Sequence, residues 1–74
     1  MKVWVITVEH RHGSDTWVRK SENGAISSLA AYVSEWWSET GQSDMPTDAA
    51  EAIEKYFALV SDEFYSLEQF EVQP

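Results

Sequence analysis

The sequence predicts an α+β fold, a single small domain spanning residues 1–74 with elements in the order ββααβ. Two β-rich segments come first, apolar residues at helical spacing fill the middle, and a third β-rich segment closes the chain. The first segment has apolar residues on both faces at its start, which is typical of a central strand. We therefore expect a three-stranded sheet in strand order 2-1-3, with two helices packed on one face.

The first two strands are expected to form a hairpin. The segment "KVWVITVEHR" (2–11) is rich in β-branched and aromatic residues, and "TWVRK" (16–20) is predicted to be the returning strand. Between them "HGSD" (12–15) favours a turn, because Gly accepts positive φ and Ser and Asp stabilise turns. One face of the first strand should carry Trp4, Ile6, Val8, His10 and His12.

Two registers of this hairpin remain open. A two-residue loop formed by Gly13 and Ser14 places His10 opposite Trp17. A three-residue loop instead places Arg11 opposite Trp17 and pairs Glu9 with Arg19. We favour the second register because it pairs opposite charges across the strands. In that register Trp17 lies on the side of the sheet away from the core.

A first helix is expected to begin at a cap formed by Ser21 or Asn23 and to run to about Glu39. Gly41 lies just past its end, where a glycine commonly closes a helix. The apolar residues of this segment have helical spacing and no strand alternative. They are Ile26, Leu29, Ala30, Val33, Trp36 and Trp37.

A second helix is expected after the polar linker "GQSDMP" (41–46), whose proline disfavours helix at the preceding residue. Thr47 is predicted to cap it, and Asp48 to lie in its first turn, where the helix dipole favours a carboxylate. The helix should end at about Leu59. Its inner stripe is predicted to be Ala49, Ile53, Tyr56, Phe57 and Val60.

The segment "EFYSLEQFEV" (63–72) is predicted to be the last strand. Its apolar residues change face midway, and a bulge near Glu68 and Gln69 would reconcile the two halves. The apolar residues in question are Tyr65 and Leu67 on one face, then Phe70 and Val72 on the other.

Charge is distributed unevenly along the chain. Residues 1–20 carry four basic and two acidic side chains, a balance of +2, whereas residues 21–74 carry eleven carboxylates and Lys55 alone, a balance of −10. The field of the second part repels nucleic-acid phosphates and attracts basic protein surfaces. We therefore expect a basic protein surface as the partner, and no direct binding of nucleic acid.

A cytoplasmic location is expected. The chain has no cysteine, so it can form neither disulfides nor thiolate metal sites. Its longest apolar run, "VWVI" (3–6), is far too short to span a bilayer, and no secretory signal precedes it. No association with a membrane is expected either.

Both histidines lie in the predicted hairpin, in the spacing His-x-His. With Asp15 as a third ligand, His10 and His12 form an alternative metal site, because imidazole and carboxylate both suit zinc. Glu9, however, faces away from both rings, and Asp15 has to bend back across the turn. We expect neither metal nor cofactor: the imidazoles should cover the open end of a small core, with one ring nitrogen bonded to the turn backbone.

No motif specifies a reaction, and we expect neither enzymatic activity nor catalytic residues. His12, Ser14 and Asp15 have the residue types of a catalytic triad, but three close neighbours in a turn cannot adopt its geometry. Neither a phosphate-binding Gly-rich loop nor a zinc-protease motif occurs in the sequence. Two helices on three strands should form a filled sandwich without a substrate pocket.

Exposed tryptophan beside carboxylates is the expected partner-binding surface. Trp36 and Trp37 are about 100° apart on a helix, so both cannot enter the same small core. We expect Trp37 to be the exposed anchor, because tryptophan dominates interface energetics. Carboxylates repeated on rigid helices would present to a basic groove what a phosphate backbone presents, although a merely solvated surface is the alternative. The expected partner-binding residues are Glu35, Glu39, Trp37, Glu51 and Glu54.

The string "VEHRHGSD…S…AAYVSEWW…EAIEKYF…EFYSLEQFEV" resembles a family of very short, uncharacterised proteins from bacterial genomes and mobile elements. The resemblance covers nearly the whole chain, and it implies no activity and no catalytic residue. By type, in size and acidity, the chain is also similar to phage-encoded inhibitors such as anti-CRISPR proteins. That similarity implies a phage or mobile-element inhibitor in the cytoplasm of a bacterial host.

We therefore expect a non-enzymatic, acidic protein-binding module that occupies a basic nucleic-acid-binding surface of a host protein complex. Two alternatives remain open. One is a small metal-binding or regulatory protein that uses His10 and His12. The other is a homodimer that pairs its exposed second strand across a two-fold axis. The oligomeric state, monomer or homodimer, is left open by the sequence.

Overall fold

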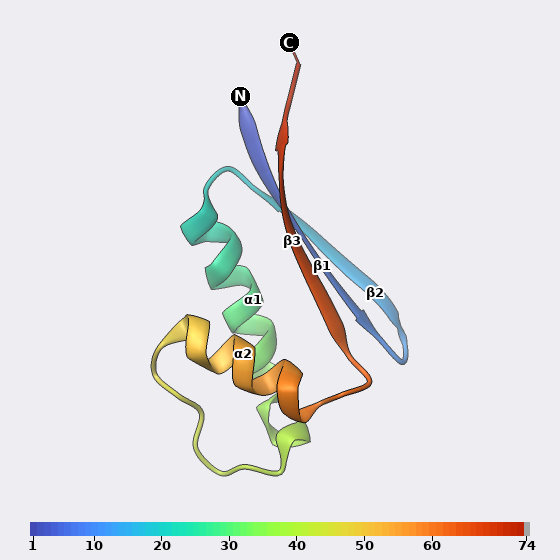
Figure 1. Cartoon of the computed structure of the whole chain (residues 1–74), viewed down its shortest axis with the longest axis vertical. Helices are drawn as coiled ribbons and strands as arrows, with labels where there is room; N and C mark the ends of the chain where they lie inside the picture. The colour runs from blue at the N-terminus through green and yellow to red at the C-terminus, as the bar shows by residue number, and fades with distance from the viewer. Residues whose placement is uncertain (74) are drawn as a thin grey trace.

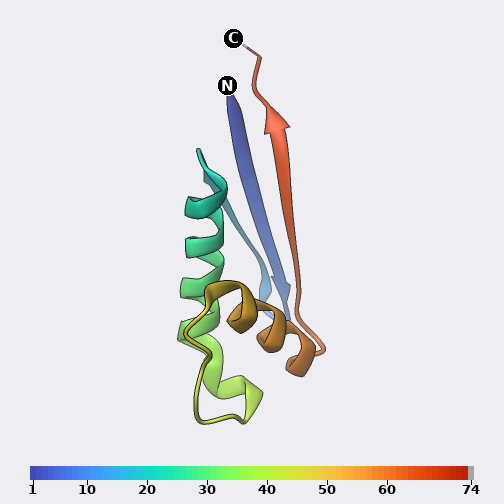
Figure 2. The same cartoon turned by 60° about the vertical axis from the view of Figure 1, so that its left-hand side comes forward.

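The computed structural model describes residues 1–73, so Pro74, the last residue of the expected domain, lies outside the described residues. The chain forms one small α+β domain with a three-stranded antiparallel sheet in the order β2-β1-β3. Both helices lie on the same face of the sheet (Figure 1, Figure 2). The predicted fold class, element order and central first strand are confirmed. The elements are β1 (Lys2–His10), β2 (Gly13–Arg19), α1 (Glu22–Trp36), the 3₁₀ turn η1 (Trp37–Thr40), α2 (Ala49–Leu59) and β3 (Phe64–Glu71).

The hairpin turn lies earlier than the sequence predicts. Arg11 and His12 form it, and Gly13 already pairs with His10 as the first residue of β2. Gly13 adopts φ +130°, a value that favours glycine, and this lets the chain reverse directly after a two-residue loop. Both expected registers are therefore wrong. Trp17 lies opposite Ile6, so it faces the helices and not the other side of the sheet.

The expected bulge in β3 is also wrong. Within the described chain, β3 pairs with β1 in one uninterrupted register, from Lys2 opposite Glu71 to Glu9 opposite Phe64. The change of face in its apolar pattern has another cause. The start of β3 lies beneath the helices and turns Leu67 towards the core, whereas its end extends past them (Figure 1). There Phe70 lies opposite Val3 on the outer face of the sheet.

The first helix begins and ends much as the sequence predicts. Ser21 is the N-cap, and its Oγ accepts a hydrogen bond from the Gly24 N–H at 3.0 Å. Regular α-helix stops at Trp36, and the chain tightens into η1 before it ends at Gly41, which adopts φ +75°. A left-handed glycine of this kind closes the helix by exposing its N–H to a preceding carbonyl, here that of Ser38 at 3.2 Å.

The second helix is capped by Asp48, one residue after the predicted cap Thr47. The Asp48 carboxylate accepts a hydrogen bond from the Glu51 N–H at 3.0 Å. Aspartate satisfies the free amides of a first turn and also complements the helix dipole, so it is a better cap than threonine here. Neither helix of residues 1–73 has the length and hydropathy needed to cross a membrane.

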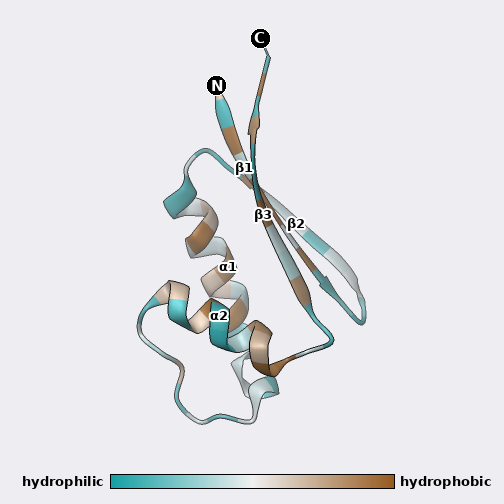
Figure 3. Cartoon of the chain, in the orientation of Figure 1, coloured by the Kyte–Doolittle hydropathy of each residue, from teal (hydrophilic) through white to brown (hydrophobic). Residues whose placement is uncertain are grey.

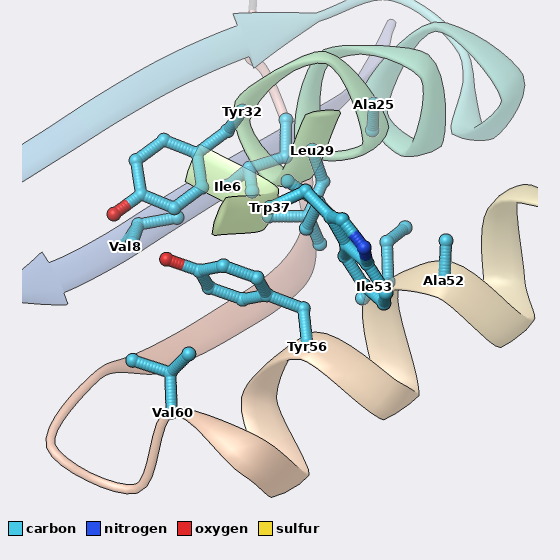
Figure 4. Close-up of a cluster of buried hydrophobic side chains, with 11 residues drawn as sticks. Ile6, Val8, Ala25, Leu29, Tyr32, Trp37, Ala52, Ile53, Tyr56 and Val60 are labelled. Atoms are coloured by element: carbon cyan, nitrogen blue, oxygen red, sulfur yellow. The ribbon is translucent and has the colours of Figure 1, made fainter. Parts of the chain in front are cut away.

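The core lies between the inner face of the sheet and the two helices. Apolar residues recur along α1 and α2 (Figure 3). In Figure 4 the buried side chains of the two helices point towards one another and towards β1. Trp4, Trp17 and Leu67 pack against the edge of this cluster. Its buried members are Ile6, Val8, Ala25, Leu29, Tyr32, Val33, Trp37, Ala52, Ile53, Tyr56 and Val60.

Candidate functional site

The four tryptophans lie at different depths. Trp4 and Trp17 are half-buried, whereas Trp37 is buried, with 7% of its surface exposed. Trp36 is 43% exposed. The expectation that Trp37 is the exposed anchor is therefore wrong. The backbone of Trp36 leaves helical geometry (φ −106°, ψ 13°), and the tight turn that follows directs Trp37 into the core beside α2.

A small pocket lies beside Trp36 and is lined by residues of the hairpin turn and of the end of α1. Its volume is about 80 Å³. The expected filled sandwich is therefore open at this end. Side chains from the hairpin, from α1 and η1, and from the connection between α2 and β3 line the pocket: His10, Arg11, His12, Asp15, Tyr32, Trp36, Glu39 and Glu63.

His10 is held on both sides of its ring. Its Nδ1 accepts a hydrogen bond from the backbone N–H of His12 at 3.2 Å, which confirms the expected bond to the turn backbone. Because Nδ1 accepts, the ring hydrogen lies on Nε2, which donates to the Asp15 carboxylate at 3.0 Å. Asp15 lies on β2 opposite Val8, so it reaches His10 diagonally on the same face without bending back.

The alternative metal residues are thus neighbours with a different arrangement. His10 and Asp15 bond to each other, and the His12 ring meets the His10 ring edge-on at a centroid distance of 6.1 Å. Within residues 1–73, no three His, Cys, Asp or Glu side chains are grouped so that they could hold a metal ion. A metal at this point would have to break the bond between His10 and Asp15.

Glu63, in the connection between α2 and β3, forms hydrogen bonds to both helices. This role of Glu63 was not identified from the sequence. Its Oε1 accepts hydrogen bonds from the hydroxyls of Tyr32 on α1 and Tyr56 on α2, at 2.7 and 2.8 Å. Burial, and then the neighbouring Glu63 carboxylate, raise the pKa of both tyrosines above the usual value. Two tyrosines at core-facing helix positions could have indicated such an acceptor from the sequence, because a buried hydroxyl requires a hydrogen-bond partner.

Tyr32 also forms the aromatic floor of the pocket. Its ring stacks on His10 at a centroid distance of 6.4 Å and meets Trp17 edge-on at 6.1 Å. On its other side it stacks on Phe57 and contacts Tyr56. These contacts connect the floor of the pocket directly to the core.

A wider, shallow groove of about 440 Å³ also borders Trp36. It shares Asp15, Tyr32 and Trp36 with the pocket, so the two hollows are neighbours. Arg19 on its wall is already held, since its guanidinium donates to the Ser28 hydroxyl at 2.8 Å and to the Val18 carbonyl at 2.9 Å. The groove is lined by Asp15, Trp17, Arg19, Ser28, Ala31, Tyr32, Glu35 and Trp36.

The four glutamates of the expected partner surface are exposed, but they do not share one face. Glu35 lines the groove and Glu39 lines the pocket, so both lie beside Trp36. Glu54 lies instead at a separate hollow between the helices and β3, and Glu51 is on the first turn of α2. Within the described chain Glu39 lies 4.0 Å from Arg11, whereas the other three form no ion pair.

No protein-family model, curated protein or solved structure matches the chain. Its function is therefore inferred from the site itself, since a small α+β fold hosts many activities. The features that bear on function are the exposed Trp36, the two hollows beside it and the carboxylates without cationic partners.

Proposed function

We propose that the protein is a non-enzymatic, acidic binding module that occupies a basic, nucleic-acid-binding surface of a partner protein. A phage or mobile-element inhibitor acting in the cytoplasm of a bacterial host is the class of protein that this proposal implies. One observation carries it. Ten of the eleven carboxylates after residue 20 are exposed, and only Glu39 and Glu71 among them lie within ion-pair distance of a basic group in residues 1–73.

Uncompensated carboxylates on rigid helices favour a cationic partner. Their common field attracts a basic surface over a distance of about 10 Å and speeds its association at low salt. The same field opposes direct contact with nucleic-acid phosphates. Each carboxylate that meets a lysine or an arginine replaces a repulsion within the free protein by an attraction.

The hydrogen bonds of His10 support a role without catalysis. Both ring nitrogens of His10 are bonded, so neither has a free lone pair or hydrogen for proton transfer to a substrate. Ser14 pairs with Glu9, so its hydroxyl lies on the opposite face of the sheet from His10 and Asp15. The three residue types of a triad are therefore divided between two faces.

A salt titration tests this proposal. We expect an arginine-rich peptide to bind with an affinity at least about tenfold lower at about 300 mM salt than at about 50 mM. An aspartate-rich peptide of the same length should not bind. Isothermal titration calorimetry measures both affinities.

Two double charge reversals locate the binding face. Glu35→Lys with Glu39→Lys, and Glu51→Lys with Glu54→Lys, change the net charge equally, and all four side chains are exposed. We expect the first pair to weaken peptide binding more, because only Glu35 and Glu39 flank Trp36. If the affinity does not depend on salt and neither double charge reversal changes it, the carboxylates serve only to keep the protein soluble. That result would contradict the proposal.

A further inference from the structure

We propose that the two hollows beside Trp36 form a receptor for an arginine side chain of the partner, with the guanidinium stacked on the Trp36 indole. This inference rests on the proposed function, and it names the chemistry by which the basic partner is recognised. It uses residues brought together from the hairpin, from α1 and from the segment before β3.

Trp36 supplies the stacking surface. Trp36 is 43% exposed and lines both hollows, so a ligand can reach its side chain without any rearrangement of the core. Tryptophan is the best aromatic partner for a cation, and the planar guanidinium of arginine stacks on it as well as being attracted to it. Tyr32 and Trp17, already in contact with each other, form the apolar wall on which the methylene groups of the side chain can lie.

Carboxylates converge on the same place. Asp15, Glu35, Glu39 and Glu63 line the two hollows, against Arg11 and Arg19, which leaves a balance of −2 when both histidines are neutral. Arg19 is occupied by its own bonds within the protein. Both tyrosine bonds to Glu63 end on Oε1. Oε2 of that carboxylate therefore remains able to accept from a ligand.

The volume of the pocket also restricts which ligands can enter it. The pocket, of about 80 Å³, has room for several water molecules, which is enough for a planar head group but not for a nucleobase with its sugar. A guanidinium presents five N–H donors in one plane, so it can bond to more than one carboxylate while its face lies on an indole. An ammonium group has no plane to stack and is more strongly hydrated.

The protein already places one guanidinium at the mouth of this pocket. Arg11, in the hairpin turn, has its Nη2 at 4.0 Å from the Glu39 Oε2, and both side chains are largely exposed. An ion pair this long and this exposed contributes little to stability, so it is easily exchanged. Arg11 therefore shows a guanidinium beside a carboxylate of the pocket. This position also makes Arg11 a competitor that an incoming arginine must displace.

The test uses two short peptides of equal charge, one with alternating arginine and glycine and one with lysine in place of arginine. We expect the arginine peptide to bind more tightly and to shift the Trp36 indole and His10 ring resonances saturably in NMR titrations. Trp36→Ala should weaken arginine binding roughly three- to tenfold. Arg11→Gln should strengthen it roughly two- to fivefold, because it removes the internal competitor.

Phe64→Ala is the matched control. Phe64 is another exposed aromatic side chain, at 63%, but it faces the opposite side of the sheet, so its truncation should leave the affinity unchanged. Equal affinity for the lysine peptide, or arginine binding unaffected by Trp36→Ala, would overturn the inference and leave the proposed function standing. Failure of both peptides to bind at low salt would overturn both.

Discussion

Truncation of Tyr56 to alanine is expected to unfold most of the protein at room temperature. Tyr56 is fully buried and lies beside Tyr32 in the core (Figure 4), with a centroid distance of 6.0 Å between the two rings. It also meets Phe57 edge-on at 4.9 Å and donates a hydrogen bond to Glu63. Removing a buried aromatic ring costs about 3–5 kcal/mol, and the loss of the bond to Glu63 adds to that cost. A domain of this size has a free energy of unfolding of about 5 kcal/mol.

Two variants separate the ring from the hydroxyl. Tyr56→Phe keeps the ring and removes only the bond to Glu63, so it should cost about 1 kcal/mol. Leu59→Ala removes an exposed side chain from the same helix and should change stability by less than about 0.5 kcal/mol. Urea unfolding followed by circular dichroism gives all three values. A Tyr56→Ala protein as stable as the Leu59→Ala protein would contradict the core described above.

The order of elements was predictable because each element repeats its own periodicity. Ile53 and Tyr56 are three residues apart on α2, a spacing that shares one face of a helix but not of a strand, and Ile6 and Val8 alternate on β1. Both sets are buried in the same core. The central position of β1 followed from its apolar residues on both faces.

The hairpin register was not predictable, because it depends on one backbone angle. Gly13 can lie inside a turn or at the start of a strand, and the residues around it suit either position. In the structure φ of +130° at Gly13 places it in β2 and leaves Arg11 and His12 as the loop. A shift of this kind also moves Trp17 to the other face, which is why its contact with Tyr32 was missed.

The candidate site was predictable in kind but not in detail. Helical geometry shows that Trp36 and Trp37 cannot both be buried in one core, but it does not show which one is exposed. That choice depends on where α1 tightens into η1, and the contacts of Trp37 with the core decide it. Glu63 was overlooked because one carboxylate among eleven carries no signal until the tyrosines that bond to it are known.

Alkaline pH is expected to unfold the protein through the two tyrosines that bond to Glu63. Burial and the neighbouring carboxylate raise the pKa of Tyr32 and Tyr56 in the folded state, whereas in the unfolded chain both should ionise near pH 10. Above that pH the unfolded state binds fewer protons than the folded state. The free energy of unfolding therefore falls as pH rises, by up to about 1.4 kcal/mol per pH unit for each tyrosine.

Together the two tyrosines lower the free energy of unfolding by about 3 kcal/mol per pH unit, so a margin of about 5 kcal/mol should be lost within about two units above pH 10. The measurement uses a Tyr65→Phe background, because Tyr65 is exposed and would add its own tyrosinate absorbance. In that background tyrosinate absorbance and circular dichroism should change together, because the two remaining hydroxyls ionise only when the core opens. Tyr32→Phe should reduce the slope by about half, since one of the two linked ionisations is removed. If tyrosinate formed while the helix signal stayed constant, or if Tyr32→Phe left the slope unchanged, the hydroxyls could not be held by Glu63 inside a closed core.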